Sequence, residues 1–376
     1  MRIGINTRFL LNKRMEGFGW YTYEVTKRLV ENHPEHEFVL FFDRPFDPKF
    51  VFGPNVIPIV LFPQARHPLL FRWWFNYSVT KALKKYKCDV FFSPDGYLSL
   101  RTDVPQIPVI HDLNFEHHPQ DLQRKHRNYY RTFFPKFAKK AAHILSVSEY
   151  SKQDIVKLYG IPEEKITVAW NGAADDFKPL NKEEIQEVRS EFSNGKPYFI
   201  FVGSLHPRKN LKTLLQAFVL FAEENSEIDL LIVGSDLWNN ASETPDESVL
   251  RLKKRIHFTG HVAFPELTKL TASAFALTYI PYFEGFGIPL VEAMKCGLPV
   301  IAGNLTSLPE VAGDAAIYVD PMNAKEVAAQ MLRLASDPEL YKQMHERSLE
   351  RSKSFSWDFT SEGVWNVIER TMEERR

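Results

Sequence analysis

This 376-residue chain has little cysteine and no long apolar run. Its two cysteines, Cys88 and Cys296, lie in different halves of the sequence, so no disulfide framework is expected and a reducing cytoplasm fits. No run of about 18 apolar residues is present, which argues against a transmembrane helix. The N-terminus, Met1-Arg-Ile-Gly-Ile-Asn6, is typical of a first strand, because its charge is not followed by the apolar region of a signal peptide.

The formal net charge of the whole chain is zero, but the two halves of the chain differ in the sign of their charge. Residues 1–180 carry 26 Lys and Arg against 19 Asp and Glu, and residues 181–376 carry 21 against 28. The basic first half indicates an anionic counterpart, and nucleic acid, an anionic bilayer and a phosphorylated acceptor are all compatible with that charge.

Short apolar runs alternate with amphipathic segments of helical length. Strands are expected near residues 2–6, 37–42, 56–60, 88–92, 107–110, 143–147, 165–169, 198–202, 228–233, 255–258, 275–279, 299–301 and 316–319. Helices are expected near residues 19–32, 68–86, 124–140, 149–158, 210–224, 265–272, 287–296, 323–336, 338–353 and 357–373. This alternation predicts an α/β protein whose parallel sheets carry helices on both faces.

The alternating pattern restarts once. Residues 171–197 are rich in polar and turn-forming residues and predict a linker, after which Tyr198-Phe-Ile-Phe-Val-Gly203 opens a new strand. Two doubly wound domains are therefore expected in series, with ligands bound at the carboxyl ends of their strands.

The first segment that carries chemistry is Phe201-Val-Gly-Ser-Leu-His-Pro-Arg-Lys-Asn-Leu211. A buried strand ends at Gly203, and a short loop then carries Arg208 and Lys209 to a helix that begins near Asn210. A helix N-terminus attracts anions, and two cations beside it suit a pyrophosphate. An isolated Arg-Lys pair is more often simply solvated, but this position between strand and helix favours an anion site.

The second segment is Pro281-Tyr-Phe-Glu-Gly-Phe-Gly-Ile-Pro-Leu-Val-Glu-Ala-Met294, which leads from a strand into a helix. Gly285 and Gly287 allow the backbone to pass close to a ligand because they lack a Cβ atom. The N–H groups of Gly287, Ile288 and Leu290 are then expected to face a phosphate or a hydroxyl. Carboxylates such as Glu284 and Glu292 accept hydrogen bonds from vicinal diols. Each acid alone is more often a surface or loop acid, and the joint pattern carries the prediction.

The Glu284-to-Glu292 spacing resembles the Glu-x7-Glu motif of glycosyltransferase family 4, and Arg208-Lys209 resembles the diphosphate-binding pair of that family. Further similar segments run along nearly the whole chain: Ser146-Val-Ser-Glu-Tyr-Ser151, Val168-Ala-Trp-Asn-Gly172, Phe258-Thr-Gly-His-Val262, Glu292-Ala-Met-Lys-Cys-Gly-Leu-Pro-Val300 and Leu308-Pro-Glu-Val-Ala-Gly313. The resemblance implies a GT-B fold, in which two Rossmann-like domains face a central cleft. Residues 1–178 would form the acceptor-side domain and residues 195–355 the nucleotide-sugar-binding domain. A helix within 356–376 would cross back to the first.

The resemblance also implies roles for individual residues. Glu284 would contact the hydroxyls of the donor sugar, Glu292 would hold the ribose, and Arg208 with Lys209 would neutralise the diphosphate. The stretch Phe258 to Val262 would lie near the base. The donor-binding set is then Gly17, Gly203, Ser204, Val262, Gly285, Phe286, Gly287, Ile288 and Glu292.

The first half adds a histidine at a strand end, in Pro108-Val-Ile-His-Asp-Leu113. His111 matches a family histidine near the anomeric carbon, although such a residue is often only structural. The catalytic set is therefore His111, Glu284, Arg208 and Lys209. His117-His118 lacks a third ligand at metal spacing, so no metal site and no metal cofactor are expected.

The turn Glu16-Gly-Phe-Gly-Trp20 follows the first strand and keeps Gly17 and Gly19 of a glycine-rich family turn. Glu16 stands where the family usually has a further glycine, which argues against a turn wrapped closely around phosphate. A simple turn between a strand and a helix is the other interpretation.

Residues 66–87 and 124–140 combine lysine and arginine with bulky aromatic side chains. Such helices lie on anionic membranes, or they turn their aromatic side chains into a core and their cations into water. Both interpretations remain open at the level of sequence.

The expected activity is transfer of a hexose, with retention and without metal, from a nucleotide-diphosphate sugar to a glycan or lipid-linked acceptor. His111-Asp-Leu-Asn-Phe-Glu-His-His-Pro119 resembles bacterial mannosyltransferases of surface polysaccharide and lipopolysaccharide synthesis. GDP-mannose is therefore the first donor expected, ahead of a UDP-sugar. A nucleotide-sugar 2-epimerase and an inactive sugar-nucleotide-binding protein are the alternatives, and no nucleic-acid partner is expected. The expected location is cytoplasmic, peripheral at the inner face of the cell membrane.

Overall fold

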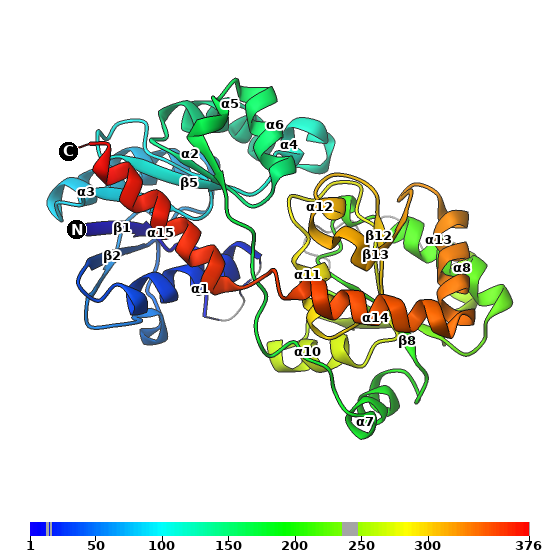
Figure 1. Ribbon diagram of the computed structural model, residues 1–376. Helices are drawn as coiled ribbons and strands as arrows, with labels where there is room; N and C mark the ends of the chain where they lie inside the picture. Colours follow the sequence, from blue (N-terminus) through cyan, green and yellow to red (C-terminus); the bar gives the residue numbers. More distant parts are fainter. Residues whose placement is uncertain (13–14, 16, 235–246, 376) are drawn as a thin grey trace. The chain divides into compact units, whose positions relative to one another are not determined.

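The structure is a computed structural model that describes residues 1–12, 15, 17–234 and 247–375. It divides into two compact units (Figure 1). Unit 1 combines Met1–Asn171 with Trp357–Arg376, and unit 2 comprises Gly172–Ser356. Unit 1 thus ends a few residues before position 178, the end expected from the sequence, and it includes the C-terminal helix.

The core of unit 1 is a parallel sheet of seven strands in the order β3-β2-β1-β4-β5-β6-β7. The strands are β1 (Arg2–Asn6), β2 (Glu37–Phe42), β3 (Val56–Val60), β4 (Val90–Ser93), β5 (Gln106–Ile110), β6 (Ile144–Ser146) and β7 (Ile166–Val168). The order reverses between β1 and β4, which is the switch point where doubly wound sheets bind ligands. β1, β4 and β5 are neighbours, so the residues that follow them share one edge.

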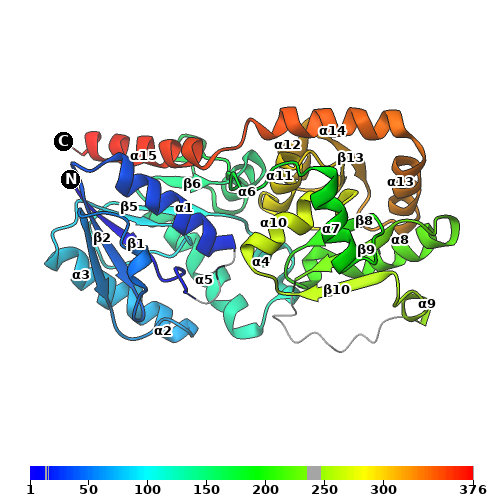
Figure 2. The same cartoon turned by 90° about the horizontal axis from the view of Figure 1, so that it is seen from below.

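Helices cover both faces of this sheet. In Figure 2, α1 (Gly17–Asn32) and α15 (Trp357–Glu373) lie along each other on one side, while α2 (Pro68–Trp73) and α3 (Thr80–Lys85) lie on the other. The remaining helices are α4 (Asn114–His117), α5 (Arg124–Lys140) and α6 (Glu149–Tyr159).

The expectation of a single continuous helix over 68–86 is wrong. A π-helical segment, Trp74–Val79, separates α2 from α3. Within it Asn76 is buried, and its side-chain oxygen accepts a hydrogen bond of 2.7 Å from the Leu100 N–H. A local change of helical pitch of this kind depends on a distant partner, which the helical periodicity of the sequence does not encode.

The two basic aromatic segments differ in where their rings lie. On α5, Tyr129, Phe134 and Phe137 are buried in the core of unit 1, as one of the two sequence interpretations expects. In the earlier segment Trp74 is fully buried, but Trp73 and its stacked neighbour Tyr77 are exposed. Only the earlier segment therefore leaves large apolar side chains in solvent.

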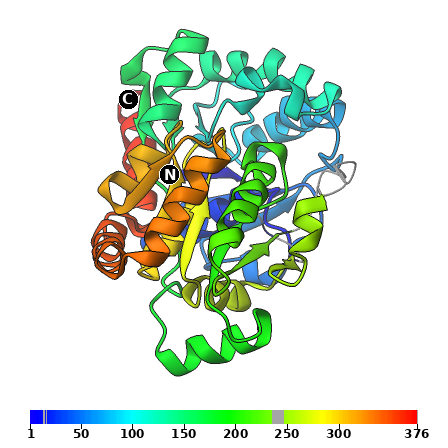
Figure 3. The ribbon, with the colours of Figure 1, turned by 90° about the vertical axis from the view of Figure 1, so that its right-hand side faces the viewer.

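Unit 2 contains a parallel sheet of six strands in the order β10-β9-β8-β11-β12-β13. The strands are β8 (Tyr198–Val202), β9 (Asp229–Val233), β10 (Ile256–Gly260), β11 (Ala276–Tyr279), β12 (Val300–Gly303) and β13 (Ala316–Val319). Its helices are α7 (Lys182–Phe192), α8 (Leu211–Glu224), α9 (Glu247–Arg251), α10 (Phe264–Ala272), α11 (Ile288–Lys295), α12 (Leu308–Ala312), α13 (Ala324–Ser336) and α14 (Pro338–Ser352). Figure 3 shows α8 (green) beside α13 (orange), and α11 packs on α14.

The boundary between the two units falls at 171/172, within the range 171–197 expected for the linker, but this range also contains a helix that was not expected, α7. The Asn181 side chain accepts a hydrogen bond from the Glu184 N–H at 2.9 Å, and the Glu184 carboxylate accepts one from the Asn181 N–H at 3.0 Å. This capping box starts a helix whose polar surface resembles a linker in composition. Over the described ranges, no helix combines the length and the apolar character that crossing a bilayer requires.

Candidate functional site

Two loops of unit 2 meet where β8 and β11, which are neighbouring strands, end. The first loop runs from Gly203 to Asn210 and the second from Ile280 to Gly287. The Tyr282 N–H donates to the Arg208 carbonyl oxygen at 3.0 Å, and the Asn210 side-chain amide donates to the Ile280 carbonyl oxygen at 3.1 Å. These bonds fix the basic and the acidic loop against each other.

The loops bring Glu284 together with both predicted cations. One Glu284 carboxylate oxygen, Oε2, lies 2.5 Å from the Lys209 Nζ and 3.3 Å from an Arg208 guanidinium nitrogen. Tyr279, which is fully buried at the end of β11, donates its hydroxyl to the same oxygen at 3.0 Å and accepts from Lys209 at 2.5 Å. Lys209 is itself 8% exposed, so the charge of this cluster is largely withdrawn from water.

The cluster keeps Glu284 ionised. Burial by itself raises the pKa of a carboxyl group, but Arg208 and Lys209 outweigh it and hold the pKa of Glu284 at about 2. Burial and the Glu284 charge together raise the pKa of Tyr279 well above its ordinary value, so this hydroxyl remains a proton donor. Sequence reasoning missed Tyr279, because nothing in its local pattern separates it from a core tyrosine.

Gly287 provides the backbone conformation that the second loop needs. Its φ of 97° is left-handed, and an added Cβ would lie 2.9 Å from the Leu308 side chain. α11 begins at the next residue, Ile288. The Leu290 N–H donates to the Gly287 carbonyl oxygen at 2.9 Å, so the expectation that it faces a ligand is wrong.

Glu292 lies one turn into α11 and is half-buried. Burial raises its pKa to about 7, and its charge acts on Tyr279, which places it beside the cluster. From the part of the chain that the structure describes, no hydrogen bond or ion pair reaches its carboxyl group. Glu284 is therefore ionised and paired with two cations, whereas Glu292 has no polar partner among the described residues and a pKa of about 7.

The other predicted residues of unit 2 lie around this cluster. The Gly203 N–H donates to Val233 at the end of β9, and Ser204 follows at the same sheet edge. Gly285 and Phe286 are buried, and the Phe286 ring packs on Phe355. Val262 follows β10, two strands away from β8.

His111 lies in unit 1, directly after β5. Its Nε2 bonds the Pro94 carbonyl oxygen at 2.7 Å, and the Phe18 and Tyr21 rings meet the imidazole edge-on. Gly17 begins α1 and is exposed, with open space where a Cβ would stand. Glu16 lies outside the described residues.

His117 belongs to a structural pair. Its Nε2 lies 2.8 Å from both carboxylate oxygens of Asp154 on α6. Within the described ranges, no group of three His, Cys, Asp or Glu side chains is arranged to hold a metal ion.

Two glycosyltransferase family models match the chain. Residues 182–351 match the group 1 glycosyl transferases, and residues 15–177 match glycosyltransferase family 4. The chain is therefore a glycosyltransferase that combines a family 4 domain with a group 1 domain. The basic pair and the two acids of this glycosyltransferase thus lie within the group 1 match, and His111 lies within the family 4 match.

Two bacterial relatives are similar over most of the glycosyltransferase. The O-antigen chain mannosyltransferase B of Escherichia coli is 29% identical over 366 residues, which cover 92% of this chain and 93% of the relative. The O-antigen chain mannosyltransferase RfbU of Salmonella typhimurium strain LT2 is 28% identical over 281 residues, 72% of each chain.

The fold is also that of solved glycosyltransferases. Anabaena Alr3699/HepE, crystallised with UDP and glucose, superposes with a TM-score of 0.77 over 98% of this chain and 100% of its own, at 16% identity. With its two doubly wound units, the glycosyltransferase has the GT-B fold expected from the sequence.

Proposed function

We propose that this glycosyltransferase moves a hexose, with retention and without a metal ion, from a nucleotide-diphosphate sugar to a glycan or lipid-linked acceptor. The observation that carries the proposal is the buried cluster of Arg208, Lys209 and Glu284 where β8 and β11 end. It offers two cations, which stabilise the charge of a departing diphosphate, and one ionised acid, which accepts hydrogen bonds from sugar hydroxyls.

In the proposed reaction the acceptor hydroxyl attacks the anomeric carbon from the face on which the diphosphate departs. The new bond joins the acceptor oxygen to the anomeric carbon, and the bond from that carbon to the phosphate oxygen breaks. Its electron pair leaves with the diphosphate, which also receives the proton of the acceptor hydroxyl. Arg208 and Lys209 stabilise the resulting charge, so no covalent nucleophile is assigned.

Mannose is the proposed sugar, and surface polysaccharide of the O-antigen kind is the proposed product. The two relatives from Escherichia coli and Salmonella typhimurium are named as O-antigen chain mannosyltransferases, which supports mannose as the transferred sugar, and GDP-mannose is the donor that we propose. The complex of HepE with UDP and glucose makes UDP-glucose the second donor to test.

The test is incubation of the metal-free protein in EDTA with GDP-mannose or UDP-glucose, with and without lipid-linked acceptor glycans. Release of nucleoside diphosphate that requires acceptor, with an α-linked product from an α-linked donor, is the expected result. An epimerised donor without nucleotide release would identify a 2-epimerase instead. Tight nucleotide binding without turnover would identify an inactive binding protein.

Peripheral contact of unit 1 with an anionic membrane is part of the proposal. Large apolar side chains protrude from α2 and its flanks, and exposed arginines stand among them. The membrane patch comprises Phe62, Leu69, Leu70, Trp73 and Tyr77 with Arg66, Arg72 and Arg101. Phe62 and Leu69 are 75% and 72% exposed, and the Arg101 guanidinium stacks on the Tyr77 ring. Aromatic rings flanked by cations suit the boundary between acyl chains and anionic headgroups.

Replacing Phe62 and Trp73 together by serine is expected to weaken binding to phosphatidylglycerol vesicles about 10-fold or more, because two apolar anchors are lost. Co-sedimentation measures the effect, and wild-type binding is expected to fall with added salt. Phe359→Ser on α15 removes another exposed phenylalanine, 62% exposed and outside the patch, and is the matched control. Equal binding by all three proteins would show that the patch does not face the membrane.

Nucleoside diphosphate affinity is expected to rise as the pH rises through about 7. Burial holds the pKa of Glu292 at about 7, and ribose hydroxyls donate to its ionised form, so nucleotide binding expels a proton. In the free protein the same shift lowers stability as the pH rises from about 4.5 to about 7, because the unfolded chain ionises first.

Glu292→Gln is the variant that isolates this titration. It is expected to bind nucleoside diphosphate about 10-fold more weakly than wild type at about pH 8, with a smaller difference at about pH 6. Calorimetry in buffers of different ionisation enthalpy counts the protons released on binding. Because Glu292→Gln has no titrating group at this position, the protons that it still releases come from the nucleotide phosphate and not from Glu292. Identical pH profiles for both proteins would remove Glu292 from the ribose site.

A further inference from the structure

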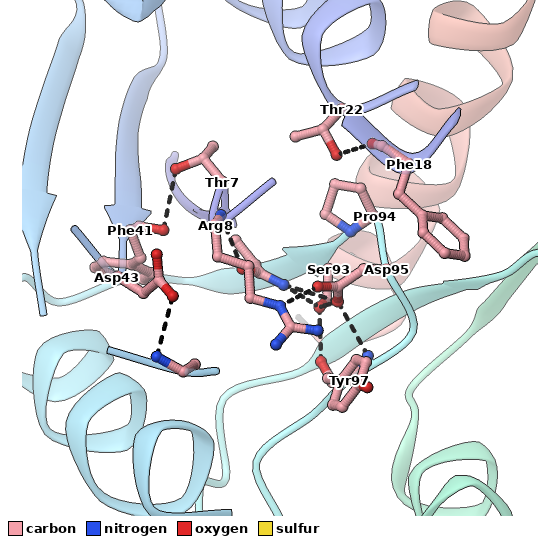
Figure 4. A network of polar contacts seen from close by, with 12 residues as sticks. Thr7, Arg8, Phe18, Thr22, Phe41, Asp43, Ser93, Pro94, Asp95 and Tyr97 are labelled. Atoms are coloured by element: carbon pink, nitrogen blue, oxygen red, sulfur yellow. Dashed lines mark hydrogen bonds and ion pairs between the residues drawn. The ribbon is translucent and has the colours of Figure 1, made fainter. Parts of the chain in front are cut away.

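A buried acid organises the turn that follows β4 in unit 1. One Asp95 oxygen, Oδ1, accepts hydrogen bonds from the Asn6 amide at 2.8 Å, the Ser93 hydroxyl at 3.2 Å and the Tyr97 N–H at 3.2 Å. The other, Oδ2, accepts from Nε of Arg8 at 2.6 Å (Figure 4). Asn6 ends β1 and Ser93 ends β4, so this network spans the switch point of the sheet.

The Arg8–Asp95 pair is buried among aromatic rings. Arg8 is 5% exposed, and its guanidinium carbon lies 4.2 Å from the centre of the Tyr97 ring and 4.9 Å from that of Phe71. Burial lowers the pKa of Arg8 and the neighbouring Asp95 raises it, and the net effect is a raised pKa, so the guanidinium carries its charge. Buried ion pairs are poor stabilisers compared with apolar side chains of the same volume, whereas they do fix a single local geometry.

That geometry acts on His111 through the residue between Ser93 and Asp95. The Pro94 carbonyl oxygen lies 2.7 Å from Nε2 of His111. Because a carbonyl oxygen only accepts, Nε2 must carry the proton. The Phe18 and Tyr21 rings meet the imidazole edge-on, with centroids 4.7 Å and 4.9 Å away, and restrict its rotation.

The second nitrogen of His111, Nδ1, is left available. No hydrogen bond joins it to any residue in the described ranges, and His111 is partly exposed. Burial lowers the pKa of His111, against the opposing effects of the Pro94 carbonyl, Asp112 and Asp95. The imidazole is therefore neutral near pH 7, and Nδ1 carries a lone pair.

We propose that Arg8 and Asp95 are positioning residues that hold the Pro94 carbonyl against Nε2 of His111, so that Nδ1 accepts a hydrogen bond from a substrate hydroxyl. The site lies at the carboxyl ends of β1, β4 and β5, where doubly wound sheets bind their ligands. The inference rests on the proposed function, since it assigns a task to His111 in that reaction. It makes His111 a hydrogen-bond acceptor rather than a cation or a proton donor toward the substrate.

The tautomer of His111 in the wild-type protein tests the first step. Two-bond ¹H–¹⁵N spectra of protein labelled with ¹⁵N-histidine distinguish Nε2–H from Nδ1–H imidazole, and His111→Gln identifies the signal. A neutral Nε2–H ring at pH 7 is the expected result. An Nδ1–H ring or an imidazolium at that pH would overturn the inference, whether or not any variant folds.

Asp95→Asn tests the positioning step, because the amide keeps the size of the side chain and loses the charge that holds Arg8. We expect the His111 signal to become a mixture of tautomers and kcat to fall about 10- to 100-fold. The dissociation constant for nucleoside diphosphate, whose proposed site lies in unit 2, should change less than about 2-fold.

Asp43→Asn is the matched control. Asp43 is also a buried acid just after a strand of the same sheet, paired with Arg44 and the Ala65 N–H, and it lies apart from the Pro94 carbonyl (Figure 4). It should lower thermal stability as Asp95→Asn does while leaving the His111 spectrum and kcat unchanged. An unchanged His111 tautomer in Asp95→Asn, or an equal loss of kcat in both variants, would make the network purely structural.

Different experiments would contradict the proposed function and the positioning role of Arg8 and Asp95. If the wild-type protein transfers no sugar from any donor, the proposed function fails, while the His111 spectrum still reports the tautomer. If transfer occurs and His111 is protonated at Nδ1, the positioning role fails and the function stands.

Discussion

Glu284→Ala is expected to lower kcat by about 10²- to 10³-fold while nucleoside diphosphate affinity holds or improves. The size follows from losing one charged group that stabilises the transition state. The direction for the nucleotide follows from the cluster, in which Glu284 pairs with Arg208 and Lys209. Without that carboxylate, both cations are free to bind the diphosphate.

Without nucleotide, Glu284→Ala should be less stable than the wild-type protein. Lys209 is 8% exposed, so removing its anionic partner leaves a buried charge that costs about 3–5 kcal/mol. We expect the Tm of Glu284→Ala to fall, and added nucleoside diphosphate to raise it by more than in wild type, because the ligand replaces the missing anion. Differential scanning fluorimetry with and without nucleotide measures both shifts.

Two further variants make this result specific. Glu284→Gln keeps a hydrogen-bond acceptor of the same size without the charge and should lie between wild type and alanine. Glu247→Ala removes an exposed acid on α9 and should behave as wild type. Near-normal turnover in Glu284→Ala, or weaker nucleotide binding in it, would contradict the assigned role.

The strands and most helices of this protein are predictable because their signals are local. The apolar runs at 2–6, 37–42, 56–60 and 198–202 are strands with those bounds, since each is a short apolar run with polar or turn residues nearby. α7 also has a local signal, its capping box, but it was missed because the composition of the segment was interpreted as that of a linker. The π-helical segment at 74–79 had no local signal.

The residues of the candidate site also fall into two groups, those that local sequence patterns predict and those that only the fold brings together. Glu284, Glu292, Arg208 and Lys209 stand in segments whose spacing is visible in the sequence. Tyr279 and Thr306 become part of the site only through folding. Tyr279 bonds the Glu284 carboxylate, and the Thr306 hydroxyl accepts from the Glu284 N–H at 3.3 Å. Contacts between separate loops depend on strand order, which the sequence pattern leaves open.

The pKa values of the buried acids are even harder to predict from the sequence. The sequence offers no reason to expect Glu284 with a pKa near 2 and Glu292 with a pKa near 7. The difference arises because Arg208 and Lys209 reach one carboxyl group, while only burial acts on the other. Asp95 is a similar case, since its partners Asn6, at the end of β1, and Arg8, in the turn that follows, lie far away in the chain.

Lys209→Met should impair both binding and turnover, in contrast to Glu284→Ala. Methionine keeps much of the length and the apolar stem of lysine but removes the charge that pairs with Glu284 at 2.5 Å. One charge-assisted hydrogen bond to the diphosphate is lost, which weakens nucleoside diphosphate binding about 10- to 100-fold. Loss of leaving-group stabilisation lowers kcat by a further 10²-fold or so.

The same change also affects Glu284 itself. With Lys209 neutral, only Arg208 opposes the burial of the Glu284 carboxyl group, so its pKa should rise from about 2 toward its ordinary value. The double variant Lys209→Met with Glu284→Gln removes both charges, and we expect it to regain Tm lost by Lys209→Met without regaining turnover. Lys212→Met, which replaces an exposed lysine at the start of α8, is the control. Nucleotide affinity that is equal in wild type and Lys209→Met would exclude Lys209 from the diphosphate site, and the proposed mechanism would then rest on Arg208 alone.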